Sequence, residues 1–368
     1  MLTSMSLTDR EREIVALLRR DPLIGSQALA HALGTTRTAV NVHLSNLGKK
    51  GVILGRGYVL SEDPAVVVIG GANMDVKARS ARAAVPATSN PGTGSMTAGG
   101  VGRNIAENLA RLGTRTQLVA AIGSDGLGDQ VLAATSGAGV HVEHVRRSAH
   151  ATGTYTAVLD ADGELVVAVS DMAATDELPP GQVDAARDLI AAASLVVLDG
   201  NLPTGTLAFA LDLATTAGAR VLLDPVSVPK AAALAHLVHS DRPLLAITPN
   251  RDELAALTGL PARTERQLEK AVRTLLDRGV ELVWVRLGRA GSVLGSASGT
   301  TVMAAVHADV ADVTGAGDAM LAAFCHALLA GAEPVDAAAY GHAAAALTVA
   351  SPHTVRPDLT DRLVRSLL

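Results

Sequence analysis

Residues 312–319 read DVTGAGDA, and this segment carries the strongest signal for chemistry in the chain. Two glycines precede a long apolar stretch, 319–329, whose alanine and leucine content is typical of a buried helix. A glycine-rich turn that opens a helix directs several unpaired N–H groups and the positive end of the helix dipole at one point, which suits a phosphate. Asp318 would lie at that point, where a carboxylate can accept the proton of a hydroxyl that attacks phosphorus. We therefore predict anion-binding amides at Gly315, Ala316 and Gly317 and a general base at Asp318; the alternative is an ordinary helix start with an acidic first turn.

Two further segments carry side chains that suit hydroxyl groups. Asn73 and Asp75 follow an apolar run at 66–69, and Gly99, Gly100 and Asn104 belong to a glycine-rich stretch before a predicted helix. A carboxylate and an amide can bind a pair of vicinal hydroxyls, and glycine lets a ligand approach the backbone closely. Taken alone, each segment is also explained by plain turn chemistry.

The elements that must position these residues alternate along the chain. Short apolar runs typical of buried strands lie at 66–69, 117–122, 195–198, 220–223, 244–247 and 282–285. Helical patterns separate them at 103–112, 126–138, 183–193, 204–217, 230–237 and 265–278. This alternation predicts an α/β fold with a doubly wound, mostly parallel sheet, which binds ligands beyond the carboxyl ends of its strands.

One region departs from the alternation. Residues 154–170 predict a hairpin around the turn at 160–163, and residues 76–98 look irregular. Together they could project as a small β lid that excludes water from a phosphoryl-transfer site. The alternative is an edge hairpin with no gating role.

The first 62 residues have a different character. They hold eight basic and five acidic residues, which gives a net charge of +3. The remainder of the chain holds 23 basic and 31 acidic residues, which gives a net charge of −8. Thr8 with Glu11 predicts a capping box, Ser26 and Thr36 can cap a second and a third helix, and apolar runs at 52–54 and 58–60 predict a hairpin. Three helices and a hairpin in this length resemble a winged helix-turn-helix domain.

A DNA interface is expected on the third of these helices. Arg37, Thr38, Asn41 and Ser45 share the face opposite its apolar side and suit base edges and phosphates, and Arg56 in the hairpin turn can meet the DNA backbone. A homodimer is expected, because a single winged helix binds weakly. The alternative is a small helical domain that only packs against the rest of the chain or mediates dimerisation.

Composition limits the remaining possibilities. Apolar residues make up 48% of the 368 residues, so a large core is expected, and Cys325 alone cannot form an internal disulfide. The chain shows no pattern of a signal peptide and no apolar run long enough to span a membrane. We therefore expect a cytoplasmic protein without a membrane partner. We divide it into a domain at 1–62, a polar linker at 61–65 and a second domain at 66–368.

The second domain resembles the ribokinase-like (PfkB) carbohydrate kinases. The resemblance rests on GGVGRNIAENLARLG at 99–113 and DVTGAGDA at 312–319, in the family's order. It implies ATP as phosphate donor, Asp318 as catalytic base, an anion hole at 315–317, and a ribose held by Asp75, Gly100 and Asn104. It further places Mg²⁺ near Asn250 and Glu253, the nucleotide near Arg286, Gly288 and Gly291, and a monovalent cation such as K⁺ near Asp312 and Thr314. His342 stands where ribokinases have an asparagine that contacts adenine.

Shorter segments resemble the pseudouridine kinases of this family. These are TSNPG at 88–92, Asp171-Met172 after the predicted hairpin, and DPVSVPK at 224–230. They imply phosphorylation of the 5′-hydroxyl of a nucleoside, with Thr154, Asp171 and Lys230 near the base. Another nucleoside, a free sugar, or a purely ligand-sensing regulator with a kinase-like domain remain as alternatives.

Overall fold

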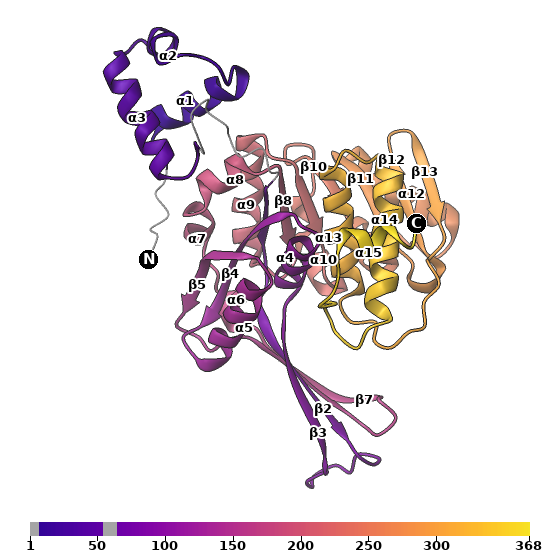
Figure 1. Ribbon diagram of the computed structural model, residues 1–368. Helices are drawn as coiled ribbons and strands as arrows, with labels where there is room; N and C mark the ends of the chain where they lie inside the picture. The colour runs from indigo at the N-terminus through magenta and orange to yellow at the C-terminus, as the bar shows by residue number, and fades with distance from the viewer. Residues whose placement is uncertain (1–6, 54–64) are drawn as a thin grey trace. The chain divides into compact units, whose positions relative to one another are not determined.

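A computed structural model describes residues 7–53 and 65–368. These residues fall into two compact units, which divide the chain after residue 63, and each unit is described by itself (Figure 1). Within the described residues, no helix combines the length and the apolarity that crossing a membrane requires.

The smaller unit consists of three helices around a small core. Its helices are α1 (Asp9–Arg20), α2 (Ser26–Ala32) and α3 (Arg37–Lys49). The predicted caps at Thr8 and Thr36 form, and Thr8 and Glu11 make the full capping box. Ser26 is not a cap: it is the first residue of α2, whose N-cap is Gly25 with no side-chain bond. Most of the predicted hairpin, including Arg56, lies outside the described residues.

The larger unit is built on a nine-stranded sheet in the order β13-β12-β11-β10-β9-β8-β1-β4-β5. Every neighbouring pair from β11 to β5 is parallel, and β12 and β13 add antiparallel strands at one edge. The strands are β1 (Ala65–Ile69), β4 (Arg115–Gly123), β5 (His141–Ser148), β8 (Leu195–Asp199), β9 (Val221–Asp224), β10 (Leu244–Ile247), β11 (Val280–Arg286), β12 (Ser292–Ser296) and β13 (Gly299–Met303). The prediction of a mostly parallel sheet is confirmed.

Helices cover both faces of this sheet. The helices of this unit are α4 (Val101–Arg111), α5 (Gly126–Gly137), α6 (Ala173–Asp176), α7 (Pro180–Asp184), α8 (Arg187–Ala192), α9 (Thr204–Ala217), α10 (Val228–Leu234), α11 (Arg251–Thr258), α12 (Glu265–Asp277), α13 (Ala316–Leu329), α14 (Pro334–Val349) and α15 (Asp361–Arg365). The predicted helix at 183–193 is broken into α7 and α8, and α13 begins three residues earlier than expected, at the glycine turn itself.

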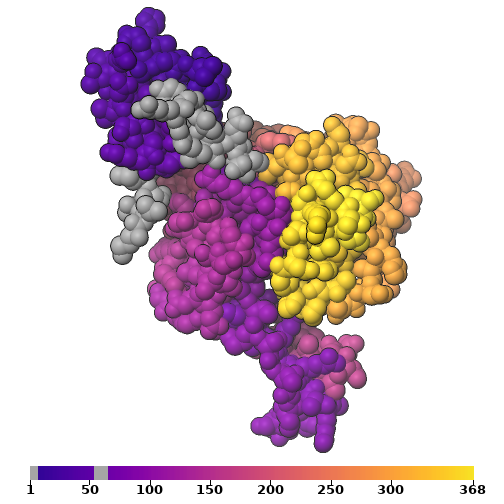
Figure 2. Space-filling view, in the orientation of Figure 1, coloured from indigo at the N-terminus to yellow at the C-terminus, as the bar shows by residue number. Residues whose placement is uncertain are grey.

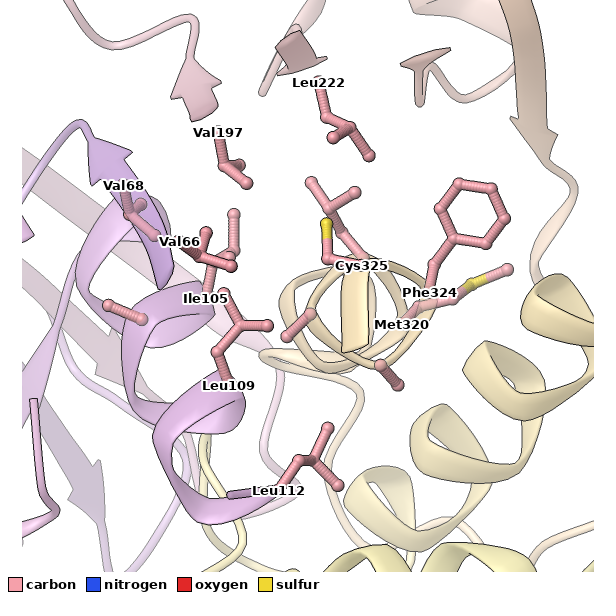
Figure 3. Packing of buried hydrophobic residues seen from close by; sticks show 14 of the residues in the cluster. Val66, Val68, Ile105, Leu109, Leu112, Val197, Leu222, Met320, Phe324 and Cys325 are labelled. Atoms are coloured by element: carbon pink, nitrogen blue, oxygen red, sulfur yellow. The ribbon is translucent and has the colours of Figure 1, made fainter. Parts of the chain in front are cut away.

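Alternate residues of the central strand β1 enter two separate cores, as a strand buried on both faces requires. Val66 and Val68 pack with residues of α4, α13 and α14, whereas Val67 and Ile69 pack with residues of α7 to α12. Figure 3 shows the first core, in which Ile105 and Leu109 of α4 lie on the same side of α13 as Cys325, while Met320 and Phe324 extend from the other side of that helix. This packing fixes the N-termini of α4 and α13 relative to each other.

A second, four-stranded sheet in the order β3-β2-β6-β7 projects from the larger unit (Figures 1 and 2). Its strands are β2 (Asn73–Ser80), β3 (Gly92–Gly99), β6 (Thr154–Leu159) and β7 (Leu165–Asp171). The predicted hairpin at 154–170 is present. Residues 76–98 are irregular only in part: 81–91 hold no helix or strand, whereas 76–80 and 92–98 belong to β2 and β3. Strand β3 is rich in glycine, threonine and serine and is exposed over most of its length, so it lacks the apolar alternation that identifies a strand.

Candidate active site

The N-terminus of α13 carries the predicted anion-binding turn. Gly315 is the N-cap with φ of +79°, and a Cβ there would lie 2.0 Å from the carbonyl oxygen of Thr354, so only glycine fits. In the part of the chain that the structure describes, no side chain caps this helix. The Ala316 amide makes a 3.3 Å bond to the carbonyl oxygen of Val313. Because no side chain of the described residues caps the turn, its N–H groups and the helix dipole can still be directed at an anion.

Asp318 lies in this first turn and contacts the N-terminal turn of α4. The Nδ2 of Asn104 donates a hydrogen bond of 2.9 Å to Oδ2 of Asp318. Arg103 in turn donates to Oδ1 of Asn104 at 3.0 Å, which fixes the orientation of the amide. Asn104, predicted to hold a ribose, thus also orients the predicted base.

The pKa of Asp318 is raised to about 7, mainly because the carboxyl is buried. The bond from Asn104 and the charge of Arg286 oppose this rise, and the carboxylates of Asp224 and Asp199 add to it. A carboxyl group whose pKa lies near neutrality can exchange a proton under physiological conditions.

Arg286 lies beside the glycine turn at the end of β11. Its guanidinium forms ion pairs with Asp224 at 3.1 Å and with Glu253 at 3.3 Å, and a Cβ on Gly317 would lie 2.4 Å from its Nη1. Because two carboxylates hold the guanidinium, Asp318 is influenced by its charge without being paired to it. The arginine therefore contributes positive charge next to the predicted phosphate position.

Asn73 and Asp75 lie at the base of β2, directly after the first strand of the main sheet. Nδ2 of Asn73 donates to Oδ1 of Asp75 at 2.7 Å, and a Cβ on Gly99 would lie 2.3 Å from the other carboxyl oxygen. Burial raises the pKa of Asp75, while Asn73, Lys77 and Arg103 lower it. The charge of Arg103 reaches both Asp75 and Asn104, so the predicted sugar-binding residues belong to one polar cluster.

Asp199, which the sequence analysis did not identify, holds the two glycine-rich segments together. Its Oδ2 accepts hydrogen bonds from the amides of Gly71 at 2.9 Å and Gly102 at 2.7 Å, and Oδ1 accepts one from Asn201 at 2.9 Å. Asp199 is fully buried at the end of β8, and Asp224 holds the same place in β9. A carboxylate that ends a buried parallel strand is the signal that could have revealed both residues.

Thr154 and Asp171 lie opposite each other at the base of the small sheet. The carbonyl oxygen of the adjacent Gly153 accepts a hydrogen bond of 2.8 Å from the amide of Met74, so Thr154 and Asp171 both lie near Asn73. Lys230 lies apart from them, in a cavity of about 290 Å³ where its Nζ is 3.4 Å from the carbonyl oxygen of Asn201 and 3.9 Å from Asp176. Proximity of these residues to a base stays a prediction.

The polar side chains predicted to contact nucleotide and Mg²⁺ already have hydrogen-bond or ion-pair partners within the protein. Asn250 and Glu253 form a capping box at the start of α11, with the Asn250 amide donating to Glu253 at 2.8 Å. Gly288 and Gly291 form the turn between β11 and β12, with φ of +59° and +93°. His342 is buried, with its Nε2 2.7 Å from Oγ of Ser292, so only Nδ1 would be left for a ligand.

Asp312 and Thr314, predicted to hold a monovalent cation, are bonded to each other and to a lysine. Oδ1 of Asp312 accepts the Thr314 amide at 2.8 Å and its hydroxyl at 2.6 Å, and Oδ2 pairs with Nζ of Lys77 at 2.9 Å. Lys77 belongs to β2, and the sequence analysis did not single it out.

In the smaller unit, Arg37, Thr38, Asn41 and Ser45 are all exposed on α3. Arg37 also donates to Oγ of Ser26 at 3.2 Å. Their contact with DNA stays a prediction.

Comparison with known proteins identifies the family. The model of the pfkB family carbohydrate kinases matches residues 63–361, and a winged helix-turn-helix DNA-binding model matches residues 7–53. The chain belongs to the PfkB family of carbohydrate kinases. It is therefore a phosphotransferase that acts on an alcohol group of a sugar or nucleoside, with an N-terminal winged helix-turn-helix domain.

Individual relatives of this PfkB kinase cover most of its length. It is 35% identical to the uncharacterized sugar kinase YeiI of Escherichia coli over 96% of this chain and 97% of that protein. It is 32% identical to the pseudouridine kinase of E. coli over 84% of this chain and 98% of that one. The structure of Arabidopsis thaliana ribokinase complexed with ribose and ATP aligns with a TM-score of 0.74 and 28% identity, over 83% of this chain and 98% of that chain.

Proposed function

We propose that this kinase transfers the γ-phosphoryl group of ATP to the 5′-hydroxyl of pseudouridine. The observation that carries the proposal is the Asp318 carboxyl, held by Asn104 at 2.9 Å at the uncapped N-terminus of α13. The choice of pseudouridine is supported by the similarity to the pseudouridine kinase of E. coli, 98% of whose length this chain matches.

In the proposed reaction, Asn73 and Asp75 bind the ribose hydroxyls and orient the 5′-oxygen in line with the phosphorus. Asp318 accepts the hydroxyl proton as the new oxygen–phosphorus bond forms. The first-turn amides of α13 and the guanidinium of Arg286 stabilise the negative charge on the transferring group. The small sheet acts as a lid that excludes water, which would otherwise accept the phosphate.

Magnesium is expected to accompany the nucleotide. Among the described residues, no group of three or more His, Cys, Asp or Glu side chains is placed to hold a metal ion. Mg²⁺ usually keeps several waters and needs only one or two carboxylates besides the phosphates, so Glu253 and Asn250 would act on the waters of the ion while Glu253 keeps its bonds to Asn250 and Arg286. The ion would neutralise phosphate charge when bound.

A screen of nucleosides tests the substrate. ADP release is measured with pseudouridine, uridine, cytidine, adenosine, inosine and ribose at equal concentrations. We expect the highest kcat/KM with pseudouridine. A clear preference for another nucleoside or for ribose would reject pseudouridine and keep the kinase, while release from none of them would favour a ligand-sensing body.

We also propose that the winged helix-turn-helix unit binds double-stranded DNA as a homodimer, through Arg37, Thr38, Asn41, Ser45 and Arg56. Support comes from the match of 7–53 to a DNA-binding family and from the exposure of the four α3 residues. A gel shift with the DNA upstream of the chain's own coding sequence, with and without nucleoside, tests both the binding and its coupling to ligand. An unshifted probe at low salt would reject DNA binding.

A further inference from the structure

Lys77 connects the small sheet to the loop that leads into the anion-binding turn. Its Nζ lies 2.9 Å from Oδ2 of Asp312 and 3.4 Å from Oγ1 of Thr314. The two partners of this ion pair are 235 positions apart in the chain and come from different parts of the larger unit. Side chains of Lys77 and Asp312 are 30% and 27% exposed, so the pair is partly shielded from water.

Both carboxyl oxygens of Asp312 already have partners. Oδ1 accepts two hydrogen bonds from Thr314, and Oδ2 faces the ammonium group of Lys77. An ammonium is a compact point charge with three donors, so it can satisfy the same oxygens that a monovalent cation would bind. A free cation at Asp312 and Thr314 would have to displace it, and two positive charges cannot share this position. These residues therefore do not fit the monovalent ion that the resemblance to ribokinases implies.

The loop between Asp312 and Gly315 is fixed from two sides. The amides of Ala311 and Asp312 donate to the carbonyl oxygen of Val349 at 2.7 Å and 3.2 Å, which secures the backbone on the α14 side. On the opposite side the Lys77 ammonium secures the Asp312 carboxylate. Gly315, the N-cap of α13, follows Thr314 directly, so we expect the Lys77 contact to help position the anion-binding turn.

We propose that Lys77 is a built-in cation, a positioning residue that replaces a monovalent ion beside the anion-binding turn and makes the kinase independent of K⁺. Only the kinetic consequences of this proposal rest on the proposed kinase reaction. It also ties the position of the small sheet to the loop, because Lys77 belongs to β2, whose base carries Asp75.

Steady-state ADP release with pseudouridine is measured in tetramethylammonium chloride and in potassium chloride at equal ionic strength. We expect the wild-type kcat to differ by less than about twofold between the two salts. Lys77→Met leaves Oδ2 of Asp312 and Oγ1 of Thr314 free for an ion, so its kcat should fall by about 10- to 100-fold without K⁺, as misplacement of a catalytic loop does. Potassium should restore most of that loss, a rescue that a merely structural lysine would not show.

Two variants serve as controls. Lys77→Arg keeps a positive charge and should stay insensitive to K⁺. Arg79→Met removes a positive charge from the same side of the same strand, but Arg79 bonds the carbonyl oxygen of Ala161 in the hairpin turn, so its response to K⁺ should equal that of the wild type. Potassium activation of the wild type, or a Lys77→Met variant that K⁺ does not rescue, would overturn the proposal.

Binding of thallium(I), followed by ²⁰⁵Tl line broadening, separates this proposal from the proposed function. The wild-type chain should not bind the ion at this site, and Lys77→Met and Lys77→Gln should bind it. Thallium bound by the wild type and lost on Asp312→Asn would contradict the built-in cation. If none of the six candidate substrates in the nucleoside screen is phosphorylated, the proposed function fails, whereas the thallium result still decides the role of Lys77.

Discussion

The carboxyl group of Asp318 is held between the first turns of two helices, and its surroundings set its protonation. Burial and two nearby carboxylates raise its pKa to about 7, against the bond from Asn104 and the charge of Arg286. Because a general base must be ionised to accept a proton, kcat/KM should rise with pH through about 7 and level off above it.

The pH profile of kcat/KM for pseudouridine checks this. The acidic limb should be absent from the residual activity of Asp318→Asn. A wild-type profile that is flat between pH 5.5 and 8.5, a range of about 3 pH units around the expected pKa, would show that another group limits the reaction.

The same raised pKa predicts that Asp318 costs stability. The pKa of Asp318 in the folded chain lies above the usual value of 3.8, so folding favours the protonated carboxyl. Below about pH 4 this group does not oppose folding, and its destabilising effect develops as the pH rises and is complete above about pH 7. Asp318→Asn should therefore be more stable than the wild type at pH 8, by up to about 4 kcal/mol, and the difference should shrink toward pH 4.

Urea unfolding at the two pH values measures this difference. The exposed Asp241→Asn is the matched control and should change the free energy of unfolding by less than about 0.5 kcal/mol at either pH. Equal destabilisation by both variants would contradict the raised pKa of Asp318.

At the scale of elements, Asp199 joins the loop after β1 to the first turn of α4. It accepts three backbone hydrogen bonds while fully buried, so Asp199→Asn would turn an NH₂ group toward amide donors. A buried donor left without an acceptor costs about 1–3 kcal/mol, and more when a charge is involved. We expect a loss of at least about 2 kcal/mol in urea unfolding of the larger unit.

Asp212→Asn is the control for this change. Asp212 makes an ion pair with Arg242 on the surface, so its loss should cost less than about 1 kcal/mol. A similar cost for the two variants would argue against an organising role for Asp199.

Local patterns predicted six of the nine strands of the main sheet but not β5, β12 and β13, and in the small sheet they predicted only the hairpin of β6 and β7. The six predicted strands, such as the run at 66–69, are continuous apolar runs because both of their faces are buried, and every predicted end agrees with the structure within two residues. Strand β3 is exposed on both faces, so no periodicity revealed it. The contact of Asn104 with Asp318 spans 214 positions and that of Lys77 with Asp312 spans 235, which no local pattern encodes.

At the scale of the whole molecule, one chain carries a PfkB kinase and a winged helix-turn-helix unit. If α3 reads DNA, Asn41→Ala should weaken binding to the specific site by about 1–3 kcal/mol and leave non-specific binding unchanged. The same variant should release ADP at the wild-type rate, because Asn41 belongs to the other compact unit.

Fluorescence anisotropy with specific and scrambled duplexes, at stated salt concentrations, measures both affinities. An equal loss on the two duplexes would assign Asn41 to phosphate contact only. No loss on either would exclude it from the interface.

The central claim is that Asp318 accepts the proton of the attacking hydroxyl, and turnover of Asp318→Asn with pseudouridine and ATP tests it most directly. Asparagine keeps the size of the side chain and can still accept the bond from Asn104, so calorimetry should find nucleoside binding little changed. ADP release should fall by about 10²–10⁴-fold. Release at close to the wild-type rate by a variant that binds the nucleoside normally would contradict the account.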